Sequence, residues 1–180
     1  VAPVAGPLTV QPVISQEGDS VMLFGSYTDT GTLDGHTVSI DWGDGSPVMS
    51  STDPNSTIVI DPVHRTYAAT HTYADNPAGR PDYVVSAFVT DDAGANSNTV
   101  TVSAVVQNVA PIFVDIAINN VAVAQIPNTG GPQPPTITID ENGMATISGS
   151  FIDPGARDTE TVSIDWGEGG ALEQAVVTTD

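Results

Sequence analysis

Two loops of this chain carry aspartate pairs whose carboxylates could bind a divalent cation. Asp29 and Asp34 lie on either side of a glycine in the first loop, and Asp153 and Asp158 have the same spacing in the second. Ca²⁺ takes roughly six to eight oxygen ligands, several from carboxylates and others from backbone carbonyls of glycine-containing loops. The pattern therefore predicts a Ca²⁺ site in each loop. The alternative is that each aspartate caps its own turn.

A third acidic turn begins at Asp91-Asp92, and this pair is also predicted to bind a metal ion. Asp41 and Asp44 form another close pair of carboxylates. Glycoside hydrolysis needs two carboxylates that face each other across a cleft, whereas these two flank a single turn. We therefore expect Asp44 to cap backbone N–H groups of that turn.

The histidines do not form a metal or catalytic motif. His36, His64 and His71 lack the spacing of a zinc site, and the chain has no cysteine that could complete one. His71 is expected to hydrogen-bond a turn. The Gly-x-Ser-x-Gly motif of a serine hydrolase is absent. The sequence thus predicts no catalytic residues, no organic cofactor and no enzymatic activity.

A segment that occurs twice positions these loops. Val38–Gly45 recurs as Val162–Gly169 at an offset of 124 residues, with Glu in place of one Asp. Apolar residues take alternate positions, which is typical of a strand with one buried face, and the glycines that follow accept the positive φ of a tight turn. We expect Trp42 and Trp166 to pack in hydrophobic cores. The alternative is that their rings bind sugars.

The rest of the chain favours β-sandwiches. Many short β-prone runs are separated by turn signals, and no segment has a helical period, which is the pattern of a two-sheet sandwich. Val109-Ala110-Pro111 repeats Val1-Ala2-Pro3 at an offset of 108 residues. We predict one sandwich over residues 1–107 and the N-terminal part of a second over 108–180, with an inserted loop at about 119–135.

The second unit lacks counterparts of the later strands of the first. Half a sandwich leaves an unpaired edge and an open apolar face, which is unfavourable in water. We therefore expect the face beside Ile164 and Trp166 to be covered by the first domain, by another copy of the protein or by a continuation of the chain.

The charge of the chain excludes several functions. It has 22 acidic and three basic residues, for a formal net charge of -19. Such a surface repels nucleic acids and anionic membranes and attracts divalent cations. No stretch of 18 apolar residues is present, so no membrane insertion is expected. The chain begins without Met, which suggests a fragment of a longer precursor.

Three motifs give the first unit a resemblance to a known family. They are Ile40-Asp41-Trp42-Gly43-Asp44-Gly45-Ser46, His71-Thr72-Tyr73, and Tyr83-Val84-Val85 with Val89-Thr90-Asp91-Asp92-Ala93-Gly94. It resembles the PKD domain, an immunoglobulin-like β-sandwich that occurs in tandem in bacterial and archaeal surface proteins. The resemblance covers residues 1–107 and the front half of the second unit. It implies a Ca²⁺ site near the Asp29 loop, since some PKD domains bind Ca²⁺ there.

Two features depart from the family pattern. Ile40 occupies the position where the family usually has Trp, and Trp42 stands immediately before the glycine of the turn. The segment between Tyr73 and Tyr83 is also longer than usual. Neither change opposes the fold, but a role of that loop in the family does not transfer to this chain.

The predicted fold is thus all-β, with tandem immunoglobulin-like sandwiches of which the second is incomplete. The expected function is that of a Ca²⁺-stabilised structural or interaction module of an extracellular or cell-surface protein, serving as spacer, adhesion or protein–protein contact. Its expected partners are other domains of the same long chain, neighbouring copies, surface proteins or polysaccharide. One alternative is a self-assembling surface-layer or filament subunit completed by strand addition. Another is a carbohydrate-binding module of a secreted hydrolase.

Overall fold

The computed structural model describes residues 1–31, 33–119, 121–123, 138 and 140–178 and divides into two compact units, Val1–Val109 and Ala110–Asp180. The described residues form β-strands and no helix. No helix is therefore long and apolar enough to cross a membrane in this part of the chain. The prediction of an all-β, sandwich-like fold is confirmed.

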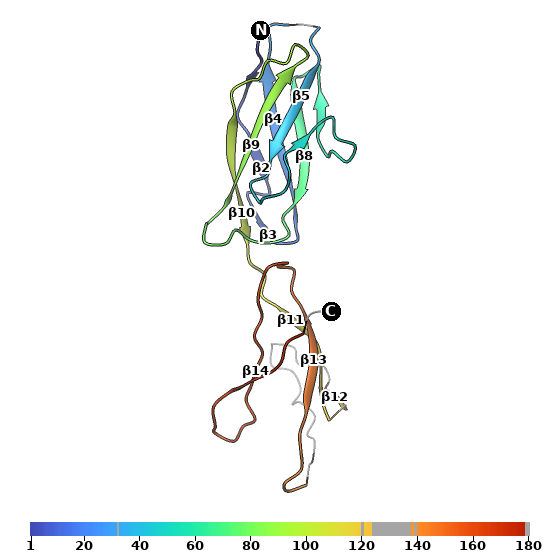
Figure 1. Cartoon of the computed structure of the whole chain (residues 1–180), viewed down its shortest axis with the longest axis vertical. Helices are drawn as coiled ribbons and strands as arrows, with labels where there is room; N and C mark the ends of the chain where they lie inside the picture. Colours follow the sequence, from blue (N-terminus) through green and yellow to red (C-terminus); the bar gives the residue numbers. More distant parts are fainter. Residues whose placement is uncertain (32, 120, 124–137, 139, 179–180) are drawn as a thin grey trace. The chain divides into compact units, whose positions relative to one another are not determined.

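One sheet of the first unit has the strand order β1-β4-β8-β7, and β2 also pairs with β4 (Figure 1). Its strands are β1 (Val4–Ala5), β2 (Thr9–Gln11), β4 (Ser20–Thr28), β7 (Val59–Asp61) and β8 (Thr66–Thr72). All pairs are antiparallel. Buried and exposed residues alternate along β4, so one face of this sheet turns to the core.

The other sheet of the first unit has the order β3-β10-β9-β5-β6. Its strands are β3 (Ile14–Gln16), β5 (His36–Asp41), β6 (Met49–Ser50), β9 (Tyr83–Asp91) and β10 (Val100–Gln107). β3 runs parallel to β10, whereas the remaining pairs are antiparallel. β9 is buried at every second residue, which matches its strongly alternating sequence.

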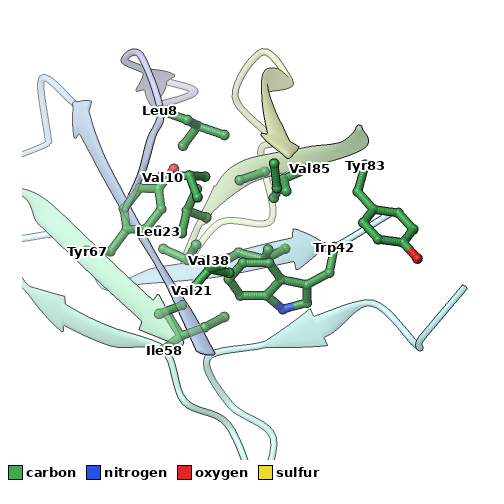
Figure 2. Packing of buried hydrophobic residues seen from close by; sticks show 14 of the residues in the cluster. Leu8, Val10, Val21, Leu23, Val38, Trp42, Ile58, Tyr67, Tyr83 and Val85 are labelled. Atoms are coloured by element: carbon green, nitrogen blue, oxygen red, sulfur yellow. The ribbon is translucent and has the colours of Figure 1, made fainter. Parts of the chain in front are cut away.

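The two sheets of the first unit enclose one hydrophobic core. Val21 and Leu23 of the first sheet pack in the same cluster as Val38 and Val85 of the second. Figure 2 shows Trp42 among these side chains. Trp42 follows β5 directly and is 1% exposed, so the prediction that this indole packs in a core is confirmed.

Strand β8 was less visible in the sequence than its neighbours. Residues 64–73 show no clear alternation in the sequence, but Thr66–Thr72 pairs with β4 over seven residues. Ala and Thr carry little apolar signal, so the alternation is weak. Tyr67 and Ala69 nevertheless point to the core, because pairing with β4 determines which face they occupy.

The second unit contains a three-stranded sheet of order β12-β11-β13 and a two-stranded hairpin, β14-β15. The strands are β11 (Ile112–Ile118), β12 (Val121–Val123), β13 (Ile147–Ile152), β14 (Ser163–Ile164) and β15 (Glu173–Gln174). The predicted insertion at about 119–135 lies mostly outside the described residues.

The strand registers of the second unit repeat those of the first. Ser39 pairs with Ser50 in the β5–β6 hairpin, and Ser163 pairs with Gln174 in the β14–β15 hairpin, so both partners are shifted by the 124 residues of the sequence repeat. At the N-terminal edges, β1 pairs with β4 and β11 pairs with β13 in corresponding registers. The two units therefore share one framework over their matching parts.

The apolar face of that framework is open in the second unit. No large apolar side chain among the described residues of this unit reaches the burial of the first core. Trp166 is 39% exposed, and its indole Nε1 donates to Glu173 Oε2 at 2.9 Å. The prediction that Trp166 packs in a core is wrong for this part of the chain. Its local sequence is that of Trp42, but the strands that bury Trp42 have no described counterpart.

Candidate functional site

Three carboxylates come together in the first unit. Asp29 and Asp34 lie in the loop between β4 and β5, and Asp91 ends β9. Pairing of β9 with β5 sets Asp91 opposite His36 and so brings it to the loop. One carboxylate oxygen from each aspartate lies within 4.8 Å of the others. The tertiary structure thus joins residues from two separately predicted sites into one acidic group.

A buried histidine supports this group. His36 Nε2 lies 2.9 Å from Asp29 Oδ2, and the two side chains are 5% and 0% exposed. The hydrogen bond with His36, followed by one from the Gly31 backbone N–H, lowers the pKa of Asp29 below its ordinary value. Asp29 is therefore held in its ionised form, which is the form that binds a cation.

Glycine at position 31 leaves room for the Asp34 carboxylate in its observed position. A Cβ atom built on Gly31 would lie 1.9 Å from Asp34 Oδ2, well inside van der Waals contact. Gly31 N–H also donates to Asp29 Oδ1 at 3.1 Å. This glycine therefore permits the close packing that brings Asp34 beside Asp29.

Arg65 closes the same loop from the turn between β7 and β8. Its guanidinium donates to the carbonyl oxygen of Asp29 and to that of Gly31 at 3.0 Å. Sequence reasoning missed both Arg65 and His36 as neighbours of the acidic loop. The one available signal was that Arg65 is among only three basic residues in the chain.

The acidic group matches a hard cation in ligand type and charge. Ca²⁺ prefers carboxylate and carbonyl oxygens, and Asp29, Asp34 and Asp91 supply three carboxylates. Two loop carbonyls are already engaged by Arg65. These three residues could therefore hold Ca²⁺ with water completing its coordination.

The other predicted ligands lie elsewhere. Asp92 is exposed and does not belong to the group of three. In the second unit, Asp153 Oδ1 accepts a hydrogen bond from Gly155 N at 3.1 Å, which repeats the Asp29 turn. Asp158 lies in the same loop. The described part of this unit has no strand equivalent to β9, which is the strand that carries Asp91 in the first unit.

The carboxylates around Trp42 have structural roles. Asp41 Oδ1 accepts from Gly43 N at 2.9 Å, and Asp44 Oδ1 accepts from Ser46 N at 3.0 Å. The expectation that Asp44 caps its turn is thus confirmed. His71 Nε2 lies 2.8 Å from Asp44 Oδ2, so the expectation that His71 hydrogen-bonds a turn is confirmed as well.

These hydrogen bonds outweigh the effect of burial on Asp44. Burial by itself would raise the pKa of Asp44, but the bonds from Ser46 and His71 together lower it below its ordinary value. The His71 ring also stacks on Trp42, with ring centroids 4.7 Å apart. Asp44 and His71 therefore hold the turn after β5 beside the buried Trp42 ring, which is a structural role.

Exposed aromatic side chains do not form a row on one strand within the described residues. Phe24 lies on β4, Phe113 on β11, and Trp166 follows β14. The carbohydrate-binding alternative would require such a row of exposed rings. The described residues thus offer no observation that favours the carbohydrate-binding alternative.

Comparison with known proteins adds no assignment, because no family model and no curated protein matches this chain. The proposed function therefore depends on the geometry of the two units.

Proposed function

We propose that this chain is a non-catalytic spacer and interaction module of a secreted or cell-surface protein, built from tandem immunoglobulin-like units of the PKD type. The observation that carries this proposal is the parallel pairing of β3 with β10. Ile14 lies opposite Val105, and Gln16 lies opposite Gln107. One strand near the start of the first unit is thereby bonded to its last strand.

This pairing is suited to bearing tension. In Figure 1 the N terminus lies at the end of the first unit opposite to the end where β10 leaves it. A pull on the two ends of this unit draws parallel neighbours in opposite directions, so their hydrogen bonds are loaded together in shear. Ser15 Oγ adds a bond to Val105 O at 3.3 Å, and Glu17 N adds one to Gln107 O at 3.0 Å.

Single-molecule force spectroscopy tests this role. The chain has no cysteine, so handles can be attached at cysteines introduced at exposed positions. Attachment through Ala2→Cys and Asn108→Cys loads the β3–β10 pair in shear. Attachment through Asp53→Cys and Ala78→Cys loads the β7–β8 side of the other sheet.

The expected result is a clearly higher unfolding force for the first pair of attachment points. Equal forces in the two directions would mean that the β3–β10 pair does not carry the load, and the spacer role would lose its main support. Equilibrium urea unfolding of both cysteine variants serves as the control, because it detects a general loss of stability that is independent of direction.

Ca²⁺ is proposed as a stabilising ligand of the first unit. The group Asp29, Asp34 and Asp91 supports this, since one carboxylate oxygen of each residue lies within 4.8 Å of the others and carboxylate oxygens are ligands that Ca²⁺ prefers. A cation there would tie the β4–β5 loop to the end of β9. It would therefore stiffen one end of the sandwich.

Strand addition by a neighbouring molecule is a second candidate function, and one observation favours it. In the first unit β4 pairs with β8 and β5 pairs with β9. In the second unit, β13 corresponds to β4 and β14 corresponds to β5. Among the described residues, β13 pairs with β11 alone and β14 pairs with β15 alone. Their other edges offer backbone groups for an incoming strand.

A further inference from the structure

We infer that Asn55 is a modification site that carries an N-linked oligosaccharide, and that this glycan covers the β6–β7 side of the first unit. The inference rests on the secreted or cell-surface location proposed above, because such glycans are added to proteins on the secretory route. It concerns residues of Val1–Val109 alone.

The sequence contains one acceptor motif. N-linked glycans are attached to an asparagine when Ser or Thr lies two residues further on and the residue between them is not Pro. Asn55-Ser56-Thr57 meets this requirement, and none of the other eight of the nine asparagines does. The chain therefore offers a single position for this modification.

A tight turn presents Asn55 to solvent. Ser56 N–H donates to Asp53 O at 3.1 Å, which closes a β-turn in the connection between β6 and β7. Asp at the first position and Pro at the second, here Pro54, are favoured in such turns. Asn55 follows at the third position and is exposed. No described residue forms a hydrogen bond with its side-chain amide, so the amide is available for modification.

Asn98 shows how this fold uses an asparagine amide when the amide has a structural role. Asn98 Oδ1 accepts from Ala5 N at 3.0 Å, and Asn98 Nδ2 donates to Ala5 O at 3.3 Å. Ala5 belongs to β1, which lies at one end of its sheet. One end of that sheet is therefore covered by a side chain, whereas Asn55 makes no comparable contact.

The Asn55 turn lies where both sheets of the first unit end. Among the described residues, β6 pairs with β5 alone and β7 pairs with β8 alone, and the turn joins β6 to β7. Val59 of β7 is 70% exposed, and Val48 and Val63 beside these strands are exposed as well. Unpaired edges with apolar side chains invite pairing with other chains. A bulky, hydrated glycan on the joining turn would shield both edges.

Thr57 has a structural role besides its place in the motif. Its Oγ1 donates to Thr70 O at 2.6 Å and accepts from Thr70 N at 3.2 Å, so it extends the pairing of β7 with β8. A glycosyltransferase recognises the same hydroxyl in the acceptor motif, and both bonds must open before it can do so. We therefore expect the chain to be modified before β7 has docked on β8.

The transfer step uses a lipid-diphosphate-linked oligosaccharide as donor. Asn55 Nδ2 forms a bond to C1 of the first sugar, and the bond from C1 to the diphosphate oxygen breaks. The lipid diphosphate leaves with the electron pair of that bond, and the proton displaced from Nδ2 passes to a base of the transferase. Nothing is oxidised or reduced, and this chain supplies only the amide and the Thr57 hydroxyl.

Secretion of the full chain from cultured eukaryotic cells tests the site. A second secreted protein that is known to be N-glycosylated serves as the internal standard. The readout is the intact mass before and after an amidase that removes N-linked glycans and leaves a carboxylate at position 55. The wild-type chain should carry the glycan. Asn96→Gln is the matched control, since Asn96 is exposed but lies outside the motif, and it should keep the glycan.

Two pairs of variants separate the motif from the fold. Asn55→Gln should lose the glycan without loss of stability, because the Asn55 side chain has no hydrogen bond among the described residues. Thr57→Ala should lose it too, whereas Thr57→Ser keeps the hydroxyl and should keep the glycan. With purified transferase and lipid-linked donor, the folded chain should react roughly tenfold more slowly than the urea-unfolded chain diluted into the assay, because the two Thr57 bonds must open first.

Thiol labelling tests the shielding of the edges. The chain has no cysteine, so a bulky maleimide reports on a single introduced thiol. Val59→Cys and Val13→Cys are matched in exposure, at 70% and 73% for the native side chains, but Val13 precedes β3 in the other sheet. The glycan should slow labelling at position 59 and leave labelling at position 13 unchanged.

An unmodified wild-type chain beside a glycosylated standard would overturn the site, as would a glycan that persists in Asn55→Gln. Equal labelling of Val59→Cys with and without the glycan would overturn the shielding, and equal transfer rates for folded and unfolded chain would overturn the order of modification. The force measurements on the β3–β10 pair use unglycosylated chain and do not depend on these results. Failure here is therefore distinguishable from failure of the spacer role.

Discussion

Glu17 Oε1 accepts a hydrogen bond from the backbone N–H of Val109 at 2.6 Å, although 92 residues separate them in the sequence. Glu17 Oε2 accepts from Asn76 N at 3.2 Å. The Glu17 residue is 2% exposed, and a buried carboxylate is tolerated when such bonds replace its hydration. One side chain thus ties the turn after β3 to the last residue of the first unit.

Replacing this carboxylate should weaken the first unit. Glu17→Gln keeps the size of the side chain but leaves its NH₂ group facing a backbone donor, so we expect a loss of about 1–3 kcal/mol in the free energy of unfolding. Urea unfolding followed by Trp42 fluorescence measures it. Glu141→Gln is the matched control, since Glu141 is the exposed counterpart of Glu17 and should leave that transition unchanged. Equal effects at the two positions would contradict the assigned role.

Ca²⁺ should stabilise the first unit through its acidic group. At a Ca²⁺ concentration 100-fold above Kd, binding adds about 2.7 kcal/mol to the free energy of unfolding, and EDTA should remove this gain. Asp34→Asn should abolish the effect, whereas Asp92→Asn should preserve it because Asp92 lies outside the group. Calorimetric unfolding with and without Ca²⁺ measures the change in stability of each variant. An unchanged melting temperature in the wild-type chain would remove the metal from the proposal.

Acid should destabilise the first unit in part through Asp44. Its pKa in the folded chain is below the ordinary value of 3.8, so its contribution to stability is present above that pH and is lost as the pH falls through the folded pKa. Asp44→Asn should therefore reduce the loss of stability between neutral pH and about pH 3. Urea unfolding at several pH values measures this. Glu168→Gln changes the counterpart of Asp44 and should not alter the pH profile of the first unit.

The two tryptophans should differ sharply in their contribution to stability. Trp42→Ala removes a 1% exposed side chain, and we expect a loss of about 3–5 kcal/mol. Trp166→Ala removes a side chain that is 39% exposed and should cost less than about 1 kcal/mol. Circular dichroism during urea unfolding compares the variants. A large effect of Trp166→Ala in the isolated monomer would show that its face is covered.

The glycines after these tryptophans provide a second comparison between the units. Gly43 and Gly167 both have positive φ, so alanine is strained at either position by about 1–2 kcal/mol. A Cβ atom on Gly43 would also lie 2.4 Å from Val84 O, whereas none of the described atoms lies within 4 Å of a Cβ on Gly167. Gly43→Ala should therefore cost about 1–3 kcal/mol more than Gly167→Ala, as measured by unfolding of each unit. Equal losses of stability would mean that the strand containing Val84 moves away from the new Cβ atom at no cost in free energy.

Local sequence determined the repeated strand of both units and the turn that follows it. The alternation of Val38, Ile40 and Trp42 predicts a strand with one inward face, and the glycines that follow predict a positive-φ turn. These features depend on steric preferences within a few residues. For that reason they appear with nearly the same φ values and hydrogen bonds in both copies.

Tertiary structure decided burial and the composition of the acidic site. Trp42 and Trp166 have the same local sequence, yet only Trp42 is enclosed, because enclosure requires distant strands such as β8 and β9 to pack over it. Asp91 joins Asp29 through the register of β9 on β5, and no local pattern contains that register. Period-2 alternation identifies which side chains share a face of a strand, but long-range pairing determines what lies against that face.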